Sequence, residues 1–285
     1  SVLVKSLGVT SMSMISINTN VGALFAAHSS YKTTKSMETS MARLASGKRI
    51  NSATDDAAGI QIATRMDTEI RGLNQAVRNA ADAQSLLMTT EGALEEVHTI
   101  LLRIRELAVQ SSNGTYTTQD RVALQAEVSD LQTEITRIST DTTWSGKKLL
   151  DGTLSSGIGF QIGADYGQTM TVSIGTIAIA DLSLGGTTIS SAVSAMAYIS
   201  IVDGAISIIS TNRGSYAAAI NRLDHTIANL QNIATNLSQS KGRIEDADFA
   251  VETANLARVQ VLQQASMAML AQANASKQNI LALFQ

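Results

Sequence analysis

No proline occurs anywhere in the 285-residue sequence. A chain of this length with average composition would contain roughly fourteen prolines. Proline removes a backbone hydrogen-bond donor and clashes with the preceding turn of a helix, so its absence removes the commonest cause of interrupted helices. We therefore expect long, uninterrupted helices to dominate the fold.

A heptad pattern in the first half of the chain predicts one such helix. Every seventh residue from Met66 to Ala108 is apolar, as in a helix that buries one stripe against a partner. The second apolar position of each heptad is polar after Val77. Val97 and Ile104, which lie next to that position on the helix, are apolar instead. The buried stripe therefore drifts around the helix. A second, shorter seam follows at Leu124, Val128, Leu131, Ile135 and Ile138.

The second half of the chain carries the more regular pattern. Between Ile199 and Leu237, apolar residues alternate at spacings of three and four, and only Arg213 interrupts them. At about 1.5 Å per residue this helix would be roughly 55–60 Å long. A helix of that length is too long for a compact globule, so the pattern favours a bundle or a coiled coil.

The middle of the chain differs in composition. Nine of the nineteen glycines lie in residues 146–186, and residues 149–211 contain neither Lys nor Arg. Apolar residues alternate with Thr, Ser or Ala in residues 170–174 and again in residues 177–180. Period-two alternation between glycines is typical of short strands. We therefore predict a small β-rich insert over residues 145–190, at the far end of a helical stalk.

Both ends of the chain carry apolar residues at helical spacing. The only charge in residues 259–285 is Lys277. A helix with so little charge is weakly solvated, so it packs either against another chain or against the N-terminal helix of its own chain, and the sequence does not choose between the two. The apolar residues expected in this packing are Val21, Leu24, Phe25, Leu256, Val259, Leu262, Met269, Leu270, Ile280 and Phe284.

The fold class that follows is mainly α. We expect a long antiparallel helical bundle or coiled-coil stalk built from both chain ends, with a small β-rich inserted outer domain. The expected divisions are an N-terminal extension (1–14), an N-terminal inner-core helix with its connecting loop (15–59), the N-terminal part of the helical core (60–144), the surface-exposed insert (145–190), the C-terminal part of the helical core (191–244) and a C-terminal inner-core helix (245–285).

Composition excludes several classes of function. The chain has no cysteine, so disulfides, thiolate zinc sites and cysteine nucleophiles are absent. The net charge of −3 gives no basic footprint for nucleic acid. No apolar run approaches the length of a membrane-spanning helix, and the N-terminus is a poor secretory signal. No nucleophile has a recognisable base, and no metal or cofactor motif has the required spacing. We therefore predict neither enzyme activity nor membrane insertion.

Several long motifs resemble bacterial flagellin, and they stand in the family's order at both ends of the chain. The resemblance covers about residues 15–285 apart from the insert. The motifs are SINTNVGAL (residues 16–24), LASGKRINSATDDAAG (44–59), LLRIRELAVQSSNGT (101–115), FQIGAD (160–165), GRIEDADFAVETANLARVQVLQQASMAMLAQAN (242–274) and QNILALF (278–284).

The resemblance implies a structural subunit that polymerises as a homo-oligomer into the extracellular flagellar filament, the helical propeller for swimming motility. The terminal helices would line the inner tube and pack between subunits, and the insert would face solvent. The resemblance also implies export by the flagellar secretion apparatus without a cleaved signal peptide. The implied partners are a secretion chaperone, a filament cap protein and hook-junction proteins. Two alternatives are a hook–filament junction protein and a surface adhesin with the β insert as its ligand-binding module.

Carboxylates cluster at two places that precede predicted helices. Carboxylates there satisfy the free backbone donors of a helix start, and we favour this role over metal binding because the ordered spacing of a calcium loop is absent. Lys48 and Arg49, beside the first cluster, also suit ion pairs between subunits. The residues expected in loop and capping roles are Asp55, Asp56, Glu245 and Asp246, and Asp248 belongs to the same cluster as the last two.

One surface of the core helices matches a recognition site known in the family. Arg103, Leu107 and Glu127 match the positions that engage the vertebrate Toll-like flagellin receptor. Packing between subunits explains the same residues, since charges flank an apolar seam there. Leu102 stands where recognised flagellins usually have Gln, which argues against recognition.

Overall fold

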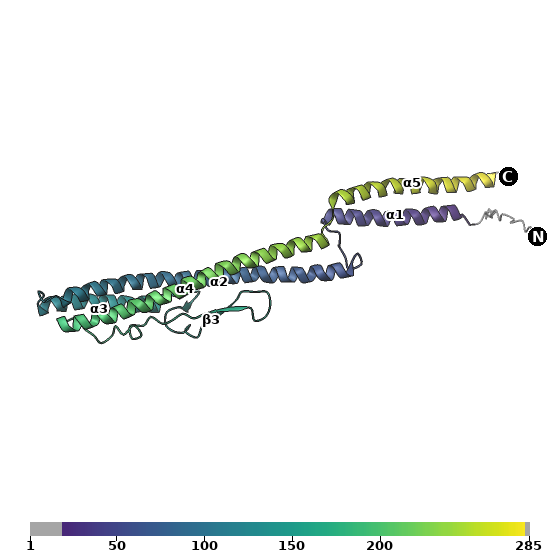
Figure 1. The fold of residues 1–285 in the computed structure, drawn as a ribbon. Coiled ribbons are helices and arrows are strands. Elements are labelled where there is room, and N and C mark those ends of the chain that lie inside the picture. The colour runs from purple at the N-terminus through teal and green to yellow at the C-terminus, as the bar shows by residue number, and fades with distance from the viewer. Residues whose placement is uncertain (1–18, 283–285) are drawn as a thin grey trace, which may run out of the picture. The chain divides into compact units, whose positions relative to one another are not determined.

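The computed structural model describes residues 19–282. Within that range the chain forms five helices and two small antiparallel sheets of two strands each (Figure 1). The prediction of a mainly α fold is confirmed. The described chain divides into two compact units, one containing both ends as far as Thr64 and from Ser240, and the other containing residues 65–239. The predicted extension, residues 1–14, lies outside the described residues.

The first unit pairs helix α1 (Val21–Ser46) with helix α5 (Phe249–Ala282), and the two lie side by side (Figure 1). Helix α1 begins at Asn20, whose side chain accepts a hydrogen bond from the backbone N–H of Ala23 at 3.1 Å. It ends at Gly47, whose φ of 71° is the left-handed conformation that glycine adopts without strain.

The second unit is built on helices α2 (Ala57–Ser112), α3 (Thr118–Asp141) and α4 (Ala192–Glu245) (Figure 1). Many of the heptad residues predicted on the two long helices are buried there, and others are partly buried. On α2, Leu87, Leu94 and Leu101 are each 0% exposed, and on α4, Val202 and Ile209 are too. These side chains belong to one continuous apolar core together with side chains from α3 and the insert.

The insert forms two hairpin-like strand pairs. Strand β1 (Thr143–Trp144) pairs with β2 (Lys147–Lys148), and β3 (Ile158–Gln161) pairs with β4 (Thr169–Val172) in the register that places Ile158 opposite Val172. The side chains of β4 alternate between exposed and buried. The predicted alternation in residues 170–172 therefore reflects a strand that covers the bundle on one side.

The prediction of a strand at residues 177–180 was wrong. Ile177 donates its backbone N–H to the carbonyl of Leu150 at 3.2 Å, and Ile174 donates to that of Leu154 at 3.2 Å. These are isolated hydrogen bonds to a turn, and they do not form the repeated pairing of a β-sheet. Ile177 is 1% exposed because it packs on the bundle core. Burial, and not strand pairing, explains the apolar residues of this segment.

Helix α4 is long and apolar enough to cross a membrane by length and composition, which the sequence analysis did not expect. Its most apolar stretch is 28% buried. That share is close to one residue per helical turn. The buried residues include Tyr198, Val202 and Ile209, which lie in the core with α2. Packing in the bundle therefore accounts for this stripe of α4.

Candidate functional site

Polar contacts hold the terminal helices α1 and α5 to each other. The order of partners along α5 is the reverse of their order along α1, so the helices are antiparallel. Hydrogen bonds between described residues cross from one helix to the other. Asn20, the N-cap of α1, donates from Nδ2 to the carbonyl of Ala273 at 3.1 Å, Ser30 Oγ donates to Met267 Sδ at 3.9 Å, and Gln263 Nε2 donates to Thr34 Oγ1 at 3.4 Å.

Few of the described side chains of this pair are fully buried. Among the described side chains of the two helices, only Ala26, Ser40 and Glu252 are buried. Ala26 and Ser40 are small, and Glu252 is charged. Because apolar burial supplies most of the stability of packed helices, contacts within one chain stabilise this pair only weakly.

Large apolar side chains stay exposed on both helices. Phe25 is 76% exposed on α1, and Met269 is 65% exposed on α5. Of the other residues predicted to pack here, Val21, Leu24 and Leu262 are also exposed, whereas Leu256, Val259 and Leu270 are half-buried. The side chains of Ile280 and Phe284 lie outside the described residues.

Two exposed apolar residues of α5 were not among those predicted from the sequence. Val261 and Met267 are 66% and 57% exposed. Val261, Met267 and Met269 project from different sides of α5, because successive residues are turned by about 100°. A helix that is apolar on several sides needs more than one neighbour to cover it. The near absence of charge beyond residue 259 was the signal for this property.

An apolar groove of about 440 Å³ runs between the two helices. Phe25 and Ala26 line it from α1, and Leu262, Met269 and Ala273 line it from α5. Exposed apolar residues lie in the groove and also on other sides of the two helices. We call these residues together the terminal-helix face and define it by Val21, Leu24, Phe25, Val261, Leu262, Met267 and Met269.

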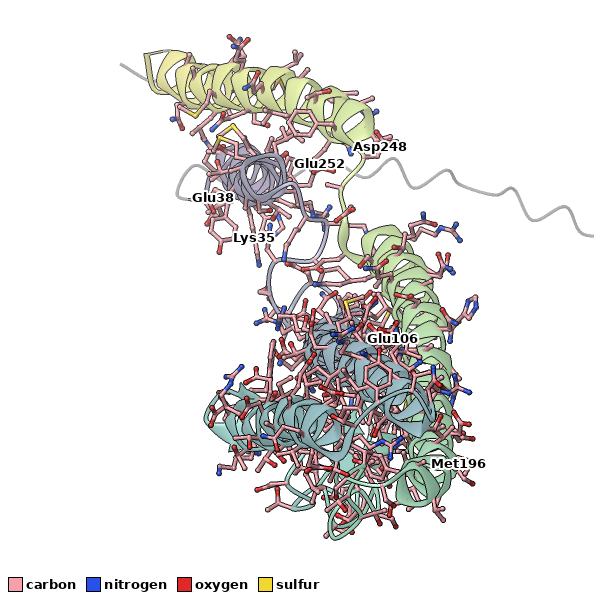
Figure 2. All side chains as sticks on the ribbon, turned by 90° about the vertical axis from the view of Figure 1, so that its left-hand side faces the viewer. Lys35, Glu38, Glu106, Met196, Asp248 and Glu252 are labelled. Carbon is pink, nitrogen blue, oxygen red and sulfur yellow. The ribbon has the colours of Figure 1, made fainter. Side chains whose placement is uncertain are left out.

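A polar recess of about 270 Å³ lies further along the same pair. Glu252 lies on the side of α5 that faces α1 (Figure 2), and its side chain is 9% exposed. Its charged partner is Arg43 on α1, whose Nη1 is 3.9 Å from Glu252 Oε1. Nε of Arg43 is buried without a hydrogen-bond partner. The two opposite charges therefore lie beside each other, one on α1 and one on α5.

The loop between α1 and α2 is held by its own carboxylates. Asp56 Oδ1 accepts a hydrogen bond from the backbone N–H of Gly59 at 2.8 Å and so caps α2. Asp55 Oδ2 accepts from the backbone N–H groups of Ser52 at 3.0 Å and Asn51 at 3.1 Å. These bonds, Ser52 first, lower the pKa of Asp55. Asp55 therefore shapes the loop, and Asp56 alone of the two caps the helix.

The same loop pairs with the segment between α4 and α5. Lys48 forms an ion pair with Glu245, and Arg49 Nη2 lies 3.8 Å from Asp56 Oδ2. Arg49 also donates from Nη2 to the carbonyl of Ile244 at 2.7 Å. Both basic residues therefore have partners within their own chain, and ion pairs between subunits stay a prediction.

One of the three carboxylates expected to cap α5 does so. Asp248 Oδ1 accepts from the backbone N–H groups of Ala250 at 2.9 Å and Val251 at 3.2 Å. Glu245 is the last residue of α4, and Asp246 follows it at the crossing between the helices. Neither reaches the free donors of α5, because both precede Asp248 in the chain and lie outside the cap position. The capping prediction is therefore wrong for Glu245 and Asp246, and among the three carboxylates Asp248 takes the cap position.

Of the three residues predicted on the core-helix surface, two are exposed. Arg103 pairs with Glu127 across α2 and α3 at 2.9 Å, and with Glu106 on its own helix at 3.1 Å. Leu107 is 1% exposed because it lies on the buried stripe of α2 beside Ile104. The expectation that Leu107 is a surface residue was therefore wrong.

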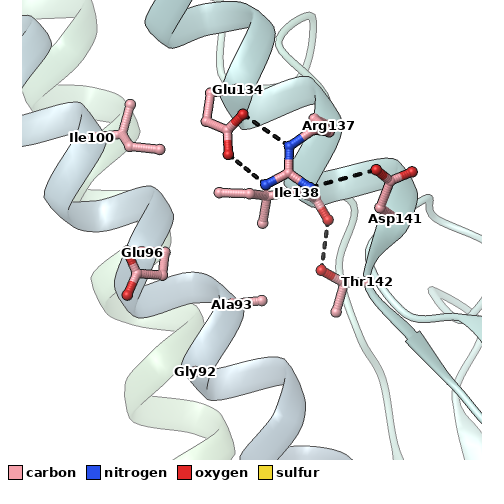
Figure 3. A pocket seen from close by; sticks show the side chains of 9 residues that line it. All are labelled: Gly92, Ala93, Glu96, Ile100, Glu134, Arg137, Ile138, Asp141 and Thr142. Carbon is pink, nitrogen blue, oxygen red and sulfur yellow. Dashed lines mark hydrogen bonds and ion pairs between the residues drawn. The ribbon is translucent and has the colours of Figure 1, made fainter.

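A second groove between α2 and α3 shows no arrangement for catalysis. Figure 3 shows the carboxylates of Glu134 and Asp141 turned toward the guanidinium of Arg137. The nearer contact, from Arg137 Nη2 to Glu134 Oε1, is 2.5 Å long. The charges of Arg137 are thus balanced by residues of its own helix. In the part of the chain that the structure describes, no group of three or more His, Asp or Glu side chains could hold a metal ion.

Known proteins agree with this architecture. The family model of the bacterial flagellin N-terminal helical region matches residues 17–155, and that of the bacterial flagellin C-terminal helical region matches residues 199–284. Flagellin from Halalkalibacterium halodurans is 43% identical over 247 residues, which cover 86% of this chain and 90% of that protein. The chain belongs to the bacterial flagellin family. A flagellar filament core protein of Brachyspira hyodysenteriae is 41% identical over 283 residues, 94% of this chain and 99% of that protein.

Membership of the flagellin family sets the class of function. Flagellins are structural proteins that polymerise into the bacterial flagellar filament, so this flagellin is a filament subunit and not an enzyme. The predicted family and function are confirmed. The alternatives of a junction protein and an adhesin are not favoured, since flagellin models match both ends of the chain.

One solved structure shares the helical fold at lower identity. A protein from Vibrio parahaemolyticus assigned as flagellar hook-associated has a TM-score of 0.58 and 19% identity, and the match covers 67% of this chain and 100% of that one. At this identity the similarity concerns the fold alone.

Proposed function

We propose that this flagellin polymerises through the terminal-helix face. The observation that carries the proposal is the exposure of Phe25, Leu262 and Met269 around an apolar groove. Surfaces of this kind are rare on proteins that stay monomeric and mark sites of association. Since α5 is apolar on several sides and α1 covers only one, neighbouring subunits cover the others.

The energetics support assembly rather than closure within one chain. Complete burial of a side chain such as Leu or Phe contributes about 1.5–3 kcal/mol relative to exposure. Several such residues per subunit can offset the translational, rotational and side-chain entropy lost on association. Contacts that join unlike surfaces repeat without closing, so they generate a helical filament instead of a ring.

The divisions of the chain take roles in this proposal. Residues 15–59 and 245–285 form the inner part of the filament, and residues 60–144 and 191–244 form the surrounding helical core. The insert, residues 145–190, faces solvent. The support for the insert's role is its charge distribution, since residues 149–211 lack Lys and Arg and so offer few ion pairs to a neighbouring subunit.

The partners of the subunit before and during assembly belong to the same proposal. An exposed apolar helix such as α5 promotes aggregation until it is covered, so a secretion chaperone binds the C-terminal region in the cell. Export uses the flagellar secretion apparatus without a cleaved signal peptide, and the extracellular filament grows with the help of a cap protein above hook-junction proteins.

Recognition by the vertebrate Toll-like receptor is a separate proposal that involves Arg103 and Glu127 alone. Their side chains are 51% and 43% exposed and pair with each other, so a receptor would have to exchange that pair for its own contacts. Leu107 is buried, and Leu102 presents an apolar side chain that is 42% exposed. A reporter assay with purified monomer tests the proposal, and absence of signal at saturating protein would contradict it.

Substitution of the terminal-helix face tests polymerisation. We expect the double variant Phe25→Ser, Leu262→Ser to form no filaments in electron micrographs at concentrations where the parent forms them. The helical content measured by circular dichroism should stay close to that of the parent, because both side chains are exposed. The matched control is Val193→Ser, which removes a side chain that is 75% exposed on α4. Normal filaments from the double variant would overturn the proposal.

A further inference from the structure

Methionine is the only sulfur-containing residue type in this chain, because cysteine is absent and ten methionines are present. Oxidation of methionine to the sulfoxide converts an apolar side chain into a polar one, and dedicated reductases reverse it. Two of the ten, Met267 and Met269, lie on α5 with exposed fractions of 57% and 65%. Peroxide in solution can therefore reach both sulfur atoms in the free subunit.

The two methionines flank the contact between α5 and α1. Met267 Sδ accepts the hydrogen bond from Ser30 Oγ at 3.9 Å. Met269 lines the apolar groove together with Phe25 and Leu262. Residues two positions apart on a helix project to different sides, so the pair occupies two sides of the surface that polymerisation would bury.

We propose that Met267 and Met269 form an oxidation-sensitive switch for polymerisation. Hydrogen peroxide transfers one oxygen atom to each thioether sulfur, so the sulfur is oxidised to the sulfoxide and the peroxide is reduced to water. The new S=O dipole is strongly solvated in the free subunit. Its burial in a mainly apolar interface leaves it without its water partners, which disfavours assembly. This inference rests on the proposed function, because only burial of the face makes the oxidation matter.

Two other methionines provide a matched comparison. Met88 on α2 and Met196 on α4 are 52% and 56% exposed, close to the values of the two on α5. Figure 2 labels Met196. They react with peroxide at similar rates if exposure controls the reaction. Neither belongs to the terminal-helix face. The effect of oxidation on assembly should therefore depend on position in the chain and not on the number of oxidised residues.

The experiment compares the full-length chain before and after treatment with hydrogen peroxide. Peptide mapping by mass spectrometry confirms the oxygen added to Met267 and Met269, and sedimentation with electron microscopy gives the critical concentration for filament formation. We expect the critical concentration of the parent to rise about tenfold or more, as an unpaired buried polar group implies. Treatment with methionine sulfoxide reductases should reverse the rise.

Variants locate the effect. The ratio of critical concentrations after and before peroxide should fall to near one in the double variant Met267→Leu, Met269→Leu. It should stay at the parent value in Met88→Leu, Met196→Leu. The variant Met267→Gln, Met269→Gln imitates the polar sulfoxide and should raise the critical concentration without peroxide.

Each contrary result has a distinct meaning. An oxidised parent that polymerises like the untreated one would overturn the switch while leaving the proposed function intact. Equal sensitivity in the Met267→Leu, Met269→Leu variant would overturn it too, as would normal assembly of the glutamine variant. Failure of the untreated parent to form filaments would contradict the proposed function, and the switch with it.

Discussion

Arg213 on α4 donates from Nη2 and Nε to the same carboxylate oxygen of Glu91 on α2, at 2.6 and 3.0 Å. Arg213 is the one residue that interrupts the regular apolar seam of α4. Glu91 is one of the polar residues in the part of the α2 heptad pattern that follows Val77. The two side chains are 29% and 31% exposed. The interruptions therefore face each other, and the charges that would disfavour burial are paired.

The pair predicts a characteristic response to substitution. Arg213→Ala leaves the half-buried carboxylate of Glu91 without its nearest partner, so we expect a loss of about 1–3 kcal/mol in the free energy of unfolding. The double variant Arg213→Leu, Glu91→Leu restores two apolar seam positions and should be as stable as the parent or more so. Chemical denaturation followed by circular dichroism measures both. A double variant less stable than the single one would contradict this pairing as the reason for the two interruptions.

The carboxylate caps give a second prediction. Replacing Asp56 or Asp248 by Ala removes the acceptor for the first free N–H groups of α2 or α5, and we expect a cost of about 1 kcal/mol for each. The matched controls are Asp56→Asn and Asp248→Asn, which keep a capping oxygen and should lose much less. Thermal denaturation of the three forms at each site provides the measurement. Equal losses for Ala and Asn would show that the charge matters and the cap does not.

Acid should destabilise the fold through identified carboxylates. The pKa of Asp55 is lowered by the backbone N–H groups of Ser52 and Asn51, and that of Asp120 by the hydroxyl and N–H of Thr117. A carboxyl whose pKa is lower in the folded state contributes stability that is present above the unfolded pKa and is lost as pH falls through the folded pKa.

The free energy of unfolding should therefore fall below about pH 4. Denaturant titrations across that range measure the slope, and Asp120→Asn should reduce it because the variant binds no proton there. The control is Glu95→Gln. The side chain of Glu95 is 63% exposed, and among the described residues no backbone N–H donates to its carboxylate. An unchanged slope in Asp120→Asn would remove the capping box as a source of acid sensitivity.

The ion pair between Arg43 and Glu252 sets the level at which α1 meets α5. Charge reversal at one partner, Arg43→Glu or Glu252→Arg, places like charges together at a mostly buried position and should abolish or strongly reduce filament yield. The double reversal restores opposite charges and should recover most of the yield. Electron microscopy of the three variants at one protein concentration tests this. Equal yields in the single and double variants would show that the pair does not fix the register.

The helices of the core were predictable from the sequence because their periodicity records burial within one chain. Leu87, Leu94 and Leu101 recur at intervals of seven and are fully buried. The segment at residues 177–180 misled the prediction because alternation records burial of every second residue, whether or not a strand forms. Leu107 was placed at the surface by family resemblance, although its position beside Ile104 on the apolar stripe already indicated burial.

For the terminal helices, the sequence could not predict which surface covers their apolar residues. Their apolar residues indicate burial, but periodicity does not say which chain supplies the covering surface. The structure shows Phe25 and Met269 exposed, which separates these residues from the core positions of α2 and α4. The acidic run of residues 245–248 offers three carboxylates for the cap of α5, and only the boundary of the helix shows that Asp248 takes this position.

Hydrogen exchange of the full-length chain, measured as monomer and as filament, tests the central claim most directly. We infer that contacts within one chain stabilise α1 and α5 weakly, and that burial against neighbouring subunits stabilises them strongly. Amides of α1 and α5 should exchange rapidly in the monomer and slowly in the filament, whereas the buried part of α2 and α4 should be protected in both. Equal exchange of α1 and α5 in the two states would contradict the claim that polymerisation buries the terminal-helix face.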